Sequence, residues 1–210
     1  MADRANGGTS SAPAAWLVVG LGNPGPEYQL TPHNLGFLTV DRVAGRNRIA
    51  VDRMEAMALV GAGAIGGHEV FLAKPQTFMN VSGQSVRQLL RRRELGLDSL
   101  LLVYDELALP WMHIRIRRRG SSAGHNGVES VIQALGSDEF ARLRLGIQPG
   151  HPVGDGAGFV LSPFRRAKYK ELDQLLEQAS VAVESIITEG VEKSMAKFNR
   201  RAPGLEQREQ

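Results

Sequence analysis

The chain has 210 residues and a formal net charge of +3; 42% of its residues are hydrophobic and 22% are charged. These values allow a globular core of about one domain and exclude wholesale disorder. Cysteine is absent, which excludes disulfides, a cysteine nucleophile, thiolate metal sites and iron–sulfur clusters.

The first half of the chain predicts a strand, a helix and a strand pair. The apolar run Trp16–Val19 indicates a buried strand that leads into a loop rich in glycine and proline. Asn34 is placed to cap a helix over Leu35–Ala44, with the next glycine as its stop. The segments Ala56–Val60 and Val70–Ala73 flank four glycines and predict two paired strands.

The second half predicts alternating helices and strands. A helix is expected over Ser82–Leu95, and the apolar run Leu100–Tyr104 predicts a buried strand. Apolar and polar residues alternate over Trp111–Arg117, which indicates a half-buried antiparallel strand with a basic outer face. The remaining expected elements are a helix over Gly127–Leu135, a strand over Arg142–Ile147, a long helix that starts at Ser162-Pro163 and runs to about Thr188, and a short helix over Val191–Asn199.

Strands and helices interleave throughout the chain, which predicts an α/β fold. We expect a single three-layer domain over residues 15–200, with a mixed, twisted central sheet flanked by helices. A disordered N-terminal tail is expected at 1–14 and a C-terminal tail at 201–210. No apolar run approaches the roughly 20 residues of a membrane-spanning helix, so we expect a cytoplasmic protein with no membrane partner.

The segment Gly20–Gly25 matches the G-x-G-x-x-G pattern of dinucleotide-binding loops and follows the first predicted strand. Such a loop must open directly into a helix, with an acidic residue at the end of a second strand about twenty residues later. Here Pro24 and Pro26 interrupt the segment, and Asp41 lies inside a predicted helix. A nucleotide-dependent oxidoreductase is therefore the weakest hypothesis, and the loop is better suited to aim Asn23 into a cleft.

Polar side chains stand at the ends of five predicted elements, where α/β proteins bind ligands. They are Asn23, His33-Asn34, Met79-Asn80, Asp105-Glu106 and His125-Asn126. Each has an ordinary structural explanation: asparagines can cap helices, which is the preferred interpretation for Asn34, and methionine is usually a core residue. A histidine near a carboxylate can also act as a general base, and asparagine amides can bind amides or an oxyanion. These residue types suit water activation by His33, but their spacing in the sequence alone does not bring them together.

Five segments resemble, in order, the signature blocks of the bacterial-type peptidyl-tRNA hydrolase family. They are GLGNPGPEY at 20–28, TPHNLG at 31–36, KPQTFMNVSG at 74–83, YDELALP at 104–110 and AGHNG at 123–127. The resemblance runs from about Trp16 to Asn199. It implies an enzyme that hydrolyses the ester between a nascent peptide and tRNA, acts as a monomer without an obligate protein partner, and uses no metal or other cofactor.

The resemblance also implies roles for individual residues. His33 matches the family's catalytic histidine, Asp105 the carboxylate that orients it, and Asn23 the loop asparagine that positions water or the oxyanion. The residues implied in substrate binding are Tyr28, Phe78, Met79, Asn80 and Asn126, and those implied in gripping tRNA phosphate are Arg117 and Arg144. His125 lies in the same motif as Asn126, and a structural role is expected for it. Pro32 stands where the family commonly has arginine, a departure that bears on tRNA contacts rather than on the reaction.

Arginines form two compact triplets, at 91–93 and 117–119, which suit either a solvated face or a phosphate-binding patch. On two of the predicted strands we expect a ridge of guanidinium groups formed by Arg115, Arg117, Arg142 and Arg144, and extended by Arg119. The alternative to an enzyme is a non-catalytic RNA-binding protein on the same fold. The intact set of His33, Asp105 and Asn23 argues against that alternative.

Overall fold

The computed structural model describes residues 13–199, so the expected tails at 1–14 and 201–210 fall outside it apart from residues 13 and 14. The strands are β1 (Ala15–Gly20), β2 (Arg53–Glu55), β3 (Ala58–Ile65), β4 (His68–Pro75), β5 (Leu100–Pro110), β6 (Ile114–Arg117) and β7 (Ala141–Gln148). The α-helices are α1 (Leu35–Asn47), α2 (Ser82–Arg92), α3 (Asn126–Leu135), α4 (Gly156–Leu161), α5 (Tyr169–Glu189) and α6 (Val191–Phe198). Short 3₁₀ helices lie between them, including η1 (Pro26–Tyr28), η2 (Pro32–Asn34) and η3 (Met79–Val81).

The strands of the described range form one seven-stranded sheet in the order β2-β3-β4-β1-β5-β7-β6. The central strands β4, β1, β5 and β7 run parallel to one another. Strands β2 and β3 on one side and β6 on the other pair antiparallel with their neighbours. The predicted mixed sheet is therefore confirmed. Because the parallel strands all end at the same edge, the loops that follow them gather there, at the edge where α/β sheets bind ligands.

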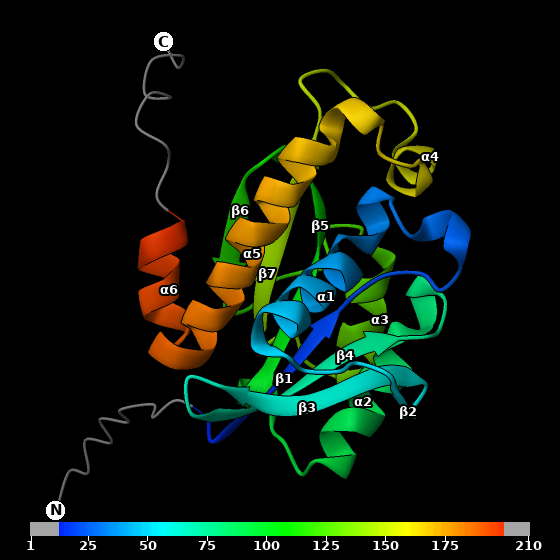
Figure 1. The fold of residues 1–210 in the computed structure, drawn as a ribbon. Coiled ribbons are helices and arrows are strands. Elements are labelled where there is room, and N and C mark those ends of the chain that lie inside the picture. The colour runs from blue at the N-terminus through cyan, green and yellow to red at the C-terminus, as the bar shows by residue number, and fades with distance from the viewer. Residues whose placement is uncertain (1–12, 200–210) are drawn as a thin grey trace, which may run out of the picture.

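Helices cover both faces of the sheet, as predicted (Figure 1). Helices α1, α5 and α6 pack on one face, over a core that includes Val18 and Leu101. Helices α2 and α3 pack on the other, over a core that includes Leu17 and Leu102. Successive residues of a central strand thus face opposite cores, which explains why all six residues of β1 are buried. Within residues 13–199, no helix is long and apolar enough to cross a bilayer.

The first helix is longer than predicted. Helix α1 continues through Gly45 to Asn47, and Arg48 ends it in the left-handed conformation with its N–H bonded to the carbonyl of Ala44. A Cβ placed on Gly45 would have nothing within 4 Å. This glycine is therefore an ordinary helix residue that faces open space, and it does not stop the helix.

The long C-terminal helix starts later than predicted. Ser162 ends α4, a short helix that the sequence did not predict, and α5 begins only at Tyr169. Asp155 caps α4 by accepting a hydrogen bond from Gly158 N at 2.9 Å. The Ser162-Pro163 pair predicts a helix start, but proline is also common just after a helix end, and that is its position here.

The start of α1 lies directly against the backbone of the sheet. A Cβ on Gly36 would lie 2.3 Å from Leu21 N and 2.4 Å from Val103 O, which no side chain can do without a backbone shift. The missing side chain thus lets α1 begin in contact with the residue that follows β1 and with the backbone of β5 at Val103. This contact holds the residues just before the helix, including His33, at the carboxyl edge of the sheet.

We expect Gly36→Ala to lower the free energy of unfolding by about 3 kcal/mol, because the added methyl group must displace backbone atoms in a packed core. Gly45→Ala, in the same helix, is the matched control and should raise stability by about 0.5–1 kcal/mol. Urea unfolding followed by circular dichroism measures both. Equal midpoints for Gly36→Ala and the parent would contradict the close contact.

Candidate active site

The polar residues predicted at element ends meet at the carboxyl edge of the sheet. Asn23 follows β1, His33 lies in η2, Met79 lies in η3 after β4, and Asp105 lies within β5. His125 directly precedes α3. The fold therefore brings separate segments of the chain to one place.

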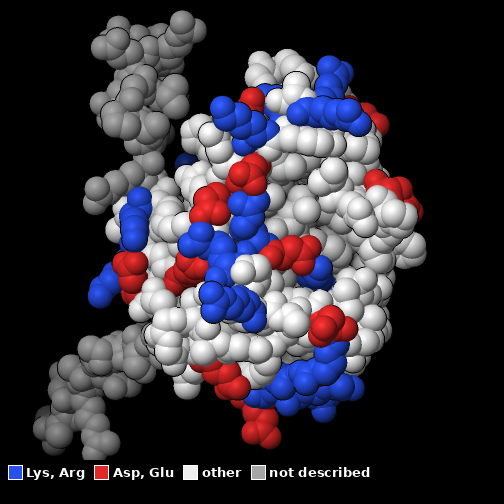
Figure 2. Space-filling view, viewed as in Figure 1, with Lys and Arg blue, Asp and Glu red and all other residues white. Residues whose placement is uncertain are grey.

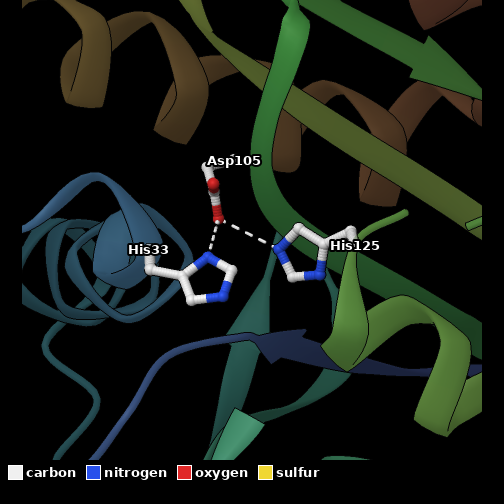
Figure 3. Close-up of side chains that lie close together, drawn as sticks. All are labelled: His33, Asp105 and His125. Carbon is white, nitrogen blue, oxygen red and sulfur yellow. Dashed lines mark hydrogen bonds and ion pairs between the residues drawn. The ribbon is translucent and has the colours of Figure 1, made fainter. Parts of the chain in front are cut away.

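Two histidines share one carboxylate oxygen at the centre of this site (Figure 3). His33 Nδ1 and His125 Nε2 each lie 3.0 Å from Asp105 Oδ1. The two imidazole centroids are 4.7 Å apart. Asp105 is 2% exposed and His33 9% exposed, so these contacts are shielded from solvent.

The hydrogen bonds around the two rings define where their protons lie. His125 Nδ1 accepts from the backbone N–H groups of Gly127 and Val128, at 3.1 and 3.3 Å, so its proton must be on Nε2, which donates to Asp105. A carboxylate only accepts, so His33 donates from Nδ1 to the same oxygen. His33 Nε2 is then left with a free lone pair and no partner among the described residues, as a general base requires.

Asp105 is held in its ionised form. Burial alone would raise the pKa of this carboxyl, but its interactions with His125, together with the hydrogen bond from His33, outweigh burial and hold the pKa well below its ordinary value. The carboxylate thus remains an acceptor for both rings over the physiological pH range. It can also stabilise a positive charge that forms on His33.

The loop after β1 is held by an asparagine pair. Asn34 Oδ1 accepts from Asn23 N at 2.8 Å, and Asn34 Nδ2 donates to Asn23 O at 3.0 Å. The capping role preferred for Asn34 is therefore wrong, because its side chain reaches across to the loop instead of back to its own helix. Asn23 Oδ1 in turn accepts from Met79 N at 2.9 Å. No described residue bonds to Asn23 Nδ2, which leaves this N–H donor free at the carboxyl edge of the sheet.

The asparagines proposed for substrate binding do not cap helices either. His125, not Asn126, caps α3 with its side chain, and Asn126 is exposed as the first helical residue. Asn80 is exposed within η3, and the residue that precedes α2 is Val81. Both amides are therefore free of the structural role that sequence alone offered for them.

The three apolar or aromatic residues predicted around the cleft differ in exposure. Met79 is buried at 5%, and Gly127 of α3 packs on its sulfur, so it has the core position typical of methionine as well as a place in the site. Phe78 is 65% exposed. Tyr28 is half-buried at the end of η1. No described hydrogen bond joins either aromatic side chain to His33.

The expected arginine ridge is only partly present. Arg117 is exposed on β6 and has no acidic partner among the described residues. Arg144 donates from Nε to Glu106 Oε2 at 2.9 Å and also from Nη2 to the same oxygen. Arg142 is 1% exposed and donates to the carbonyls of Ser121 and Asp138. Its place in the ridge is wrong, because two backbone carbonyls bind the Nη1 and Nη2 groups of this guanidinium inside the protein.

His33, Asp105 and His125 also form a set of possible metal ligands, with one ligand atom from each within 4.8 Å of the others. The proton positions disfavour metal binding. His125 Nε2 carries a proton, and moving it to Nδ1 would break two hydrogen bonds from the backbone. The set is better suited to hold protons than a cation.

Comparison with known proteins identifies related chains. Residues 17–206 match the family model described as peptidyl-tRNA hydrolase. The chain is 54% identical over 194 residues to the peptidyl-tRNA hydrolase of Solibacter usitatus, covering 92% of this chain and 99% of that protein. It is 49% identical to the one from Koribacter versatilis, covering 88% and 92%. The crystal structure of peptidyl-tRNA hydrolase from Acinetobacter baumannii matches with a TM-score of 0.83 at 33% identity, covering 93% of this chain and 100% of that one.

The lowered pKa of Asp105 predicts a pH-dependent contribution to stability. A carboxyl whose pKa is lower in the folded state stabilises the fold above its unfolded pKa, about 3.9, and this contribution is lost as the pH falls through the folded value. We expect Asp105→Asn to lower the free energy of unfolding by about 1–3 kcal/mol at pH 7. The difference from the parent should shrink below about pH 4. Urea unfolding at several pH values measures it, and a difference that stays constant down to about pH 2 would contradict the ionised, paired carboxylate.

Proposed function

The chain belongs to the peptidyl-tRNA hydrolase family, and we propose that the site around His33 cleaves the ester bond between the peptide and the tRNA. The family, the α/β fold and the hydrolase activity expected from the sequence are confirmed by these relatives. One observation carries the assignment of the site: His33 Nδ1 is bonded to Asp105, while Nε2 is free to accept a proton.

The proposed reaction uses His33 as base and then as acid. Nε2 takes a proton from a water molecule, whose oxygen attacks the ester carbonyl carbon. Asn23 Nδ2 donates a hydrogen bond to the oxyanion that forms, and Asp105 stabilises the imidazolium. The bond from the carbonyl carbon to the ribose oxygen then breaks, and the proton on Nε2 passes to that oxygen. The products are a free peptide carboxyl group and tRNA with its terminal hydroxyl.

The residues around the base suit the two halves of the substrate. The exposed amides of Asn80 and Asn126 can pair with the amide groups of a peptide, and contact of Tyr28, Phe78 and Met79 with the substrate is part of the proposal. For the tRNA, Arg117 offers an unneutralised guanidinium. Arg144 offers one whose orientation Glu106 already holds. Phosphate contact at these arginines is part of the proposal.

The chemistry needs no cofactor, since water, one base and one oxyanion donor account for every step. We also propose that the protein acts as a monomer, because the residues assigned to the reaction all come from one chain. A cytoplasmic location fits a substrate that ribosomes produce. A non-catalytic RNA-binding protein on the same fold is not favoured, because such a role does not require a buried pair of His33 and Asp105.

His33→Ala should lower kcat by about 10²–10⁴-fold, because a general base typically contributes that much, while KM changes little. The assay follows cleavage of N-blocked aminoacyl-tRNA. His68→Ala, at the start of β4 and away from the site, is the matched control and should behave like the parent. Near-parental turnover of a folded His33→Ala variant would rule out the proposed mechanism.

We assign His125 as a positioning residue, and His125→Asn separates its two contacts. Asparagine is a good helix cap, so it can replace the acceptor for α3 while losing the donor to Asp105. We expect kcat to fall about tenfold with KM retained. The free energy of unfolding should fall by about 1.5–3 kcal/mol, because the buried carboxylate of Asp105 loses one hydrogen bond.

His125→Ala should show the same loss in kcat, and it should in addition lower stability by about 1 kcal/mol because the helix cap is removed. Thermal unfolding and steady-state kinetics on the two variants measure these effects. Parental kcat for His125→Asn would limit His125 to a capping role.

A further inference from the structure

The exposed face of α2 carries arginines that the proposed reaction does not use. The buried side of helix α2 includes Val86, Leu89 and Leu90. The opposite side is formed by the exposed residues Gln84, Arg87, Gln88, Arg91 and Arg92. These positions repeat at helical spacing, so the arginines project from a single face. Figure 2 shows a gathering of basic side chains over the end of this helix, at the bottom of the view.

These arginines are not neutralised by neighbours. In the described part of the chain, the side chains of Arg87, Arg91 and Arg92 have no ion-pair or hydrogen-bond partner. On the opposite face of the sheet, in contrast, Arg42 and Arg46 of α1 are bound by acidic residues of α5. Charges left unpaired at a surface attract a polyanion most strongly.

Helices α2 and α3 both begin near the active site and run away from it, so the α2 face leads outward from the site. Helix α2 begins just after η3, and its 11 residues correspond to about 16 Å, so it carries the arginines away from the ester-cleaving centre. Helix α3 also begins at the site and lies beside α2, where Gly83 N donates to Ser130 Oγ at 3.0 Å. Both helices then lead to strands that begin at the amino edge of the sheet.

Another arginine with no acidic partner among the described residues, Arg117, lies on the side of α3 that faces away from α2. Arg117 pairs across β6 and β7 with Arg142, close to the amino end of β7. Between Arg117 and α2, helix α3 contributes one charged residue, Glu129, whose carboxylate accepts a hydrogen bond from Gln133. The surface over α2 and α3 is therefore bordered by unpaired arginines on both sides, with little negative charge between them.

We propose that Arg87, Arg91 and Arg92 bind phosphates of the double-helical acceptor arm of the substrate tRNA, away from the ester. This rests on the proposed function, which places the tRNA end at His33. Phosphates recur along both strands of a duplex, so an arm lying along α2 and α3 presents them to arginines on either side. This interaction depends on the charge and helical shape of the acceptor arm rather than on its nucleotide sequence.

The test compares two triple variants on two substrates. Arg87→Gln/Arg91→Gln/Arg92→Gln removes the charges, and Arg87→Lys/Arg91→Lys/Arg92→Lys retains them as the matched control; both replacements are good helix formers. One substrate is N-blocked aminoacyl-tRNA, and the other is the same blocked aminoacyl ester on the trinucleotide CCA, which lacks the acceptor duplex.

For the glutamine variant we expect a higher KM on full-length tRNA, with the KM on the trinucleotide much less affected. The slope of log KM against log salt concentration should become shallower by about 0.7–0.9 for each phosphate that the variant no longer neutralises. The lysine variant should keep most of the slope.

An unchanged KM and salt slope on full-length tRNA would overturn the proposal, and so would an equal loss on both substrates. If the parent protein cleaved neither substrate, the proposed function itself would fail. Titration of all three proteins with deacylated tRNA then still tests the α2 face, because binding without cleavage has the same salt dependence.

Discussion

One buried carboxylate oxygen organises this protein. Asp105 Oδ1 receives hydrogen bonds from His33 and His125, which belong to segments 92 residues apart by their numbers in the sequence. A buried acceptor with two donors tolerates little displacement of either ring, since an unsatisfied charged group in the interior is costly. The approach of α1 to the sheet at Gly36 and the first turn of α3 are both needed to keep these donors in place.

The surroundings of this oxygen show how capping and catalysis use the same groups. His125 satisfies two free N–H groups at the start of α3 and by doing so fixes its own proton on the nitrogen that faces Asp105. Asn34 likewise uses both ends of its amide to hold the loop that presents Asn23. In each case a residue that stabilises local structure also determines which atom of a neighbour remains available.

The features predicted well from the sequence are those with a local pattern. The apolar run of β1 and the alternation in β6 indicate their burial directly, and polar residues after strands pointed to the correct edge of the sheet. Asn34 was misinterpreted because its partner lies eleven positions away, whereas a cap has a signal in adjacent residues. Arg142 was misplaced because its alternation with leucine resembles a solvated strand, and only the tertiary fold brings two carbonyls to its guanidinium.

The acceptor position of His125 Nδ1 has a consequence for how many protons the site can store. That nitrogen is saturated by two backbone donors, Asp105 remains ionised, and both ring nitrogens facing Asp105 already carry protons. Among the atoms of His33, His125 and Asp105 discussed above, His33 Nε2 is thus the one that can accept a further proton. The site can therefore accept only one proton in each hydrolytic cycle. His33 must transfer this proton to the leaving group before it can activate a second water molecule.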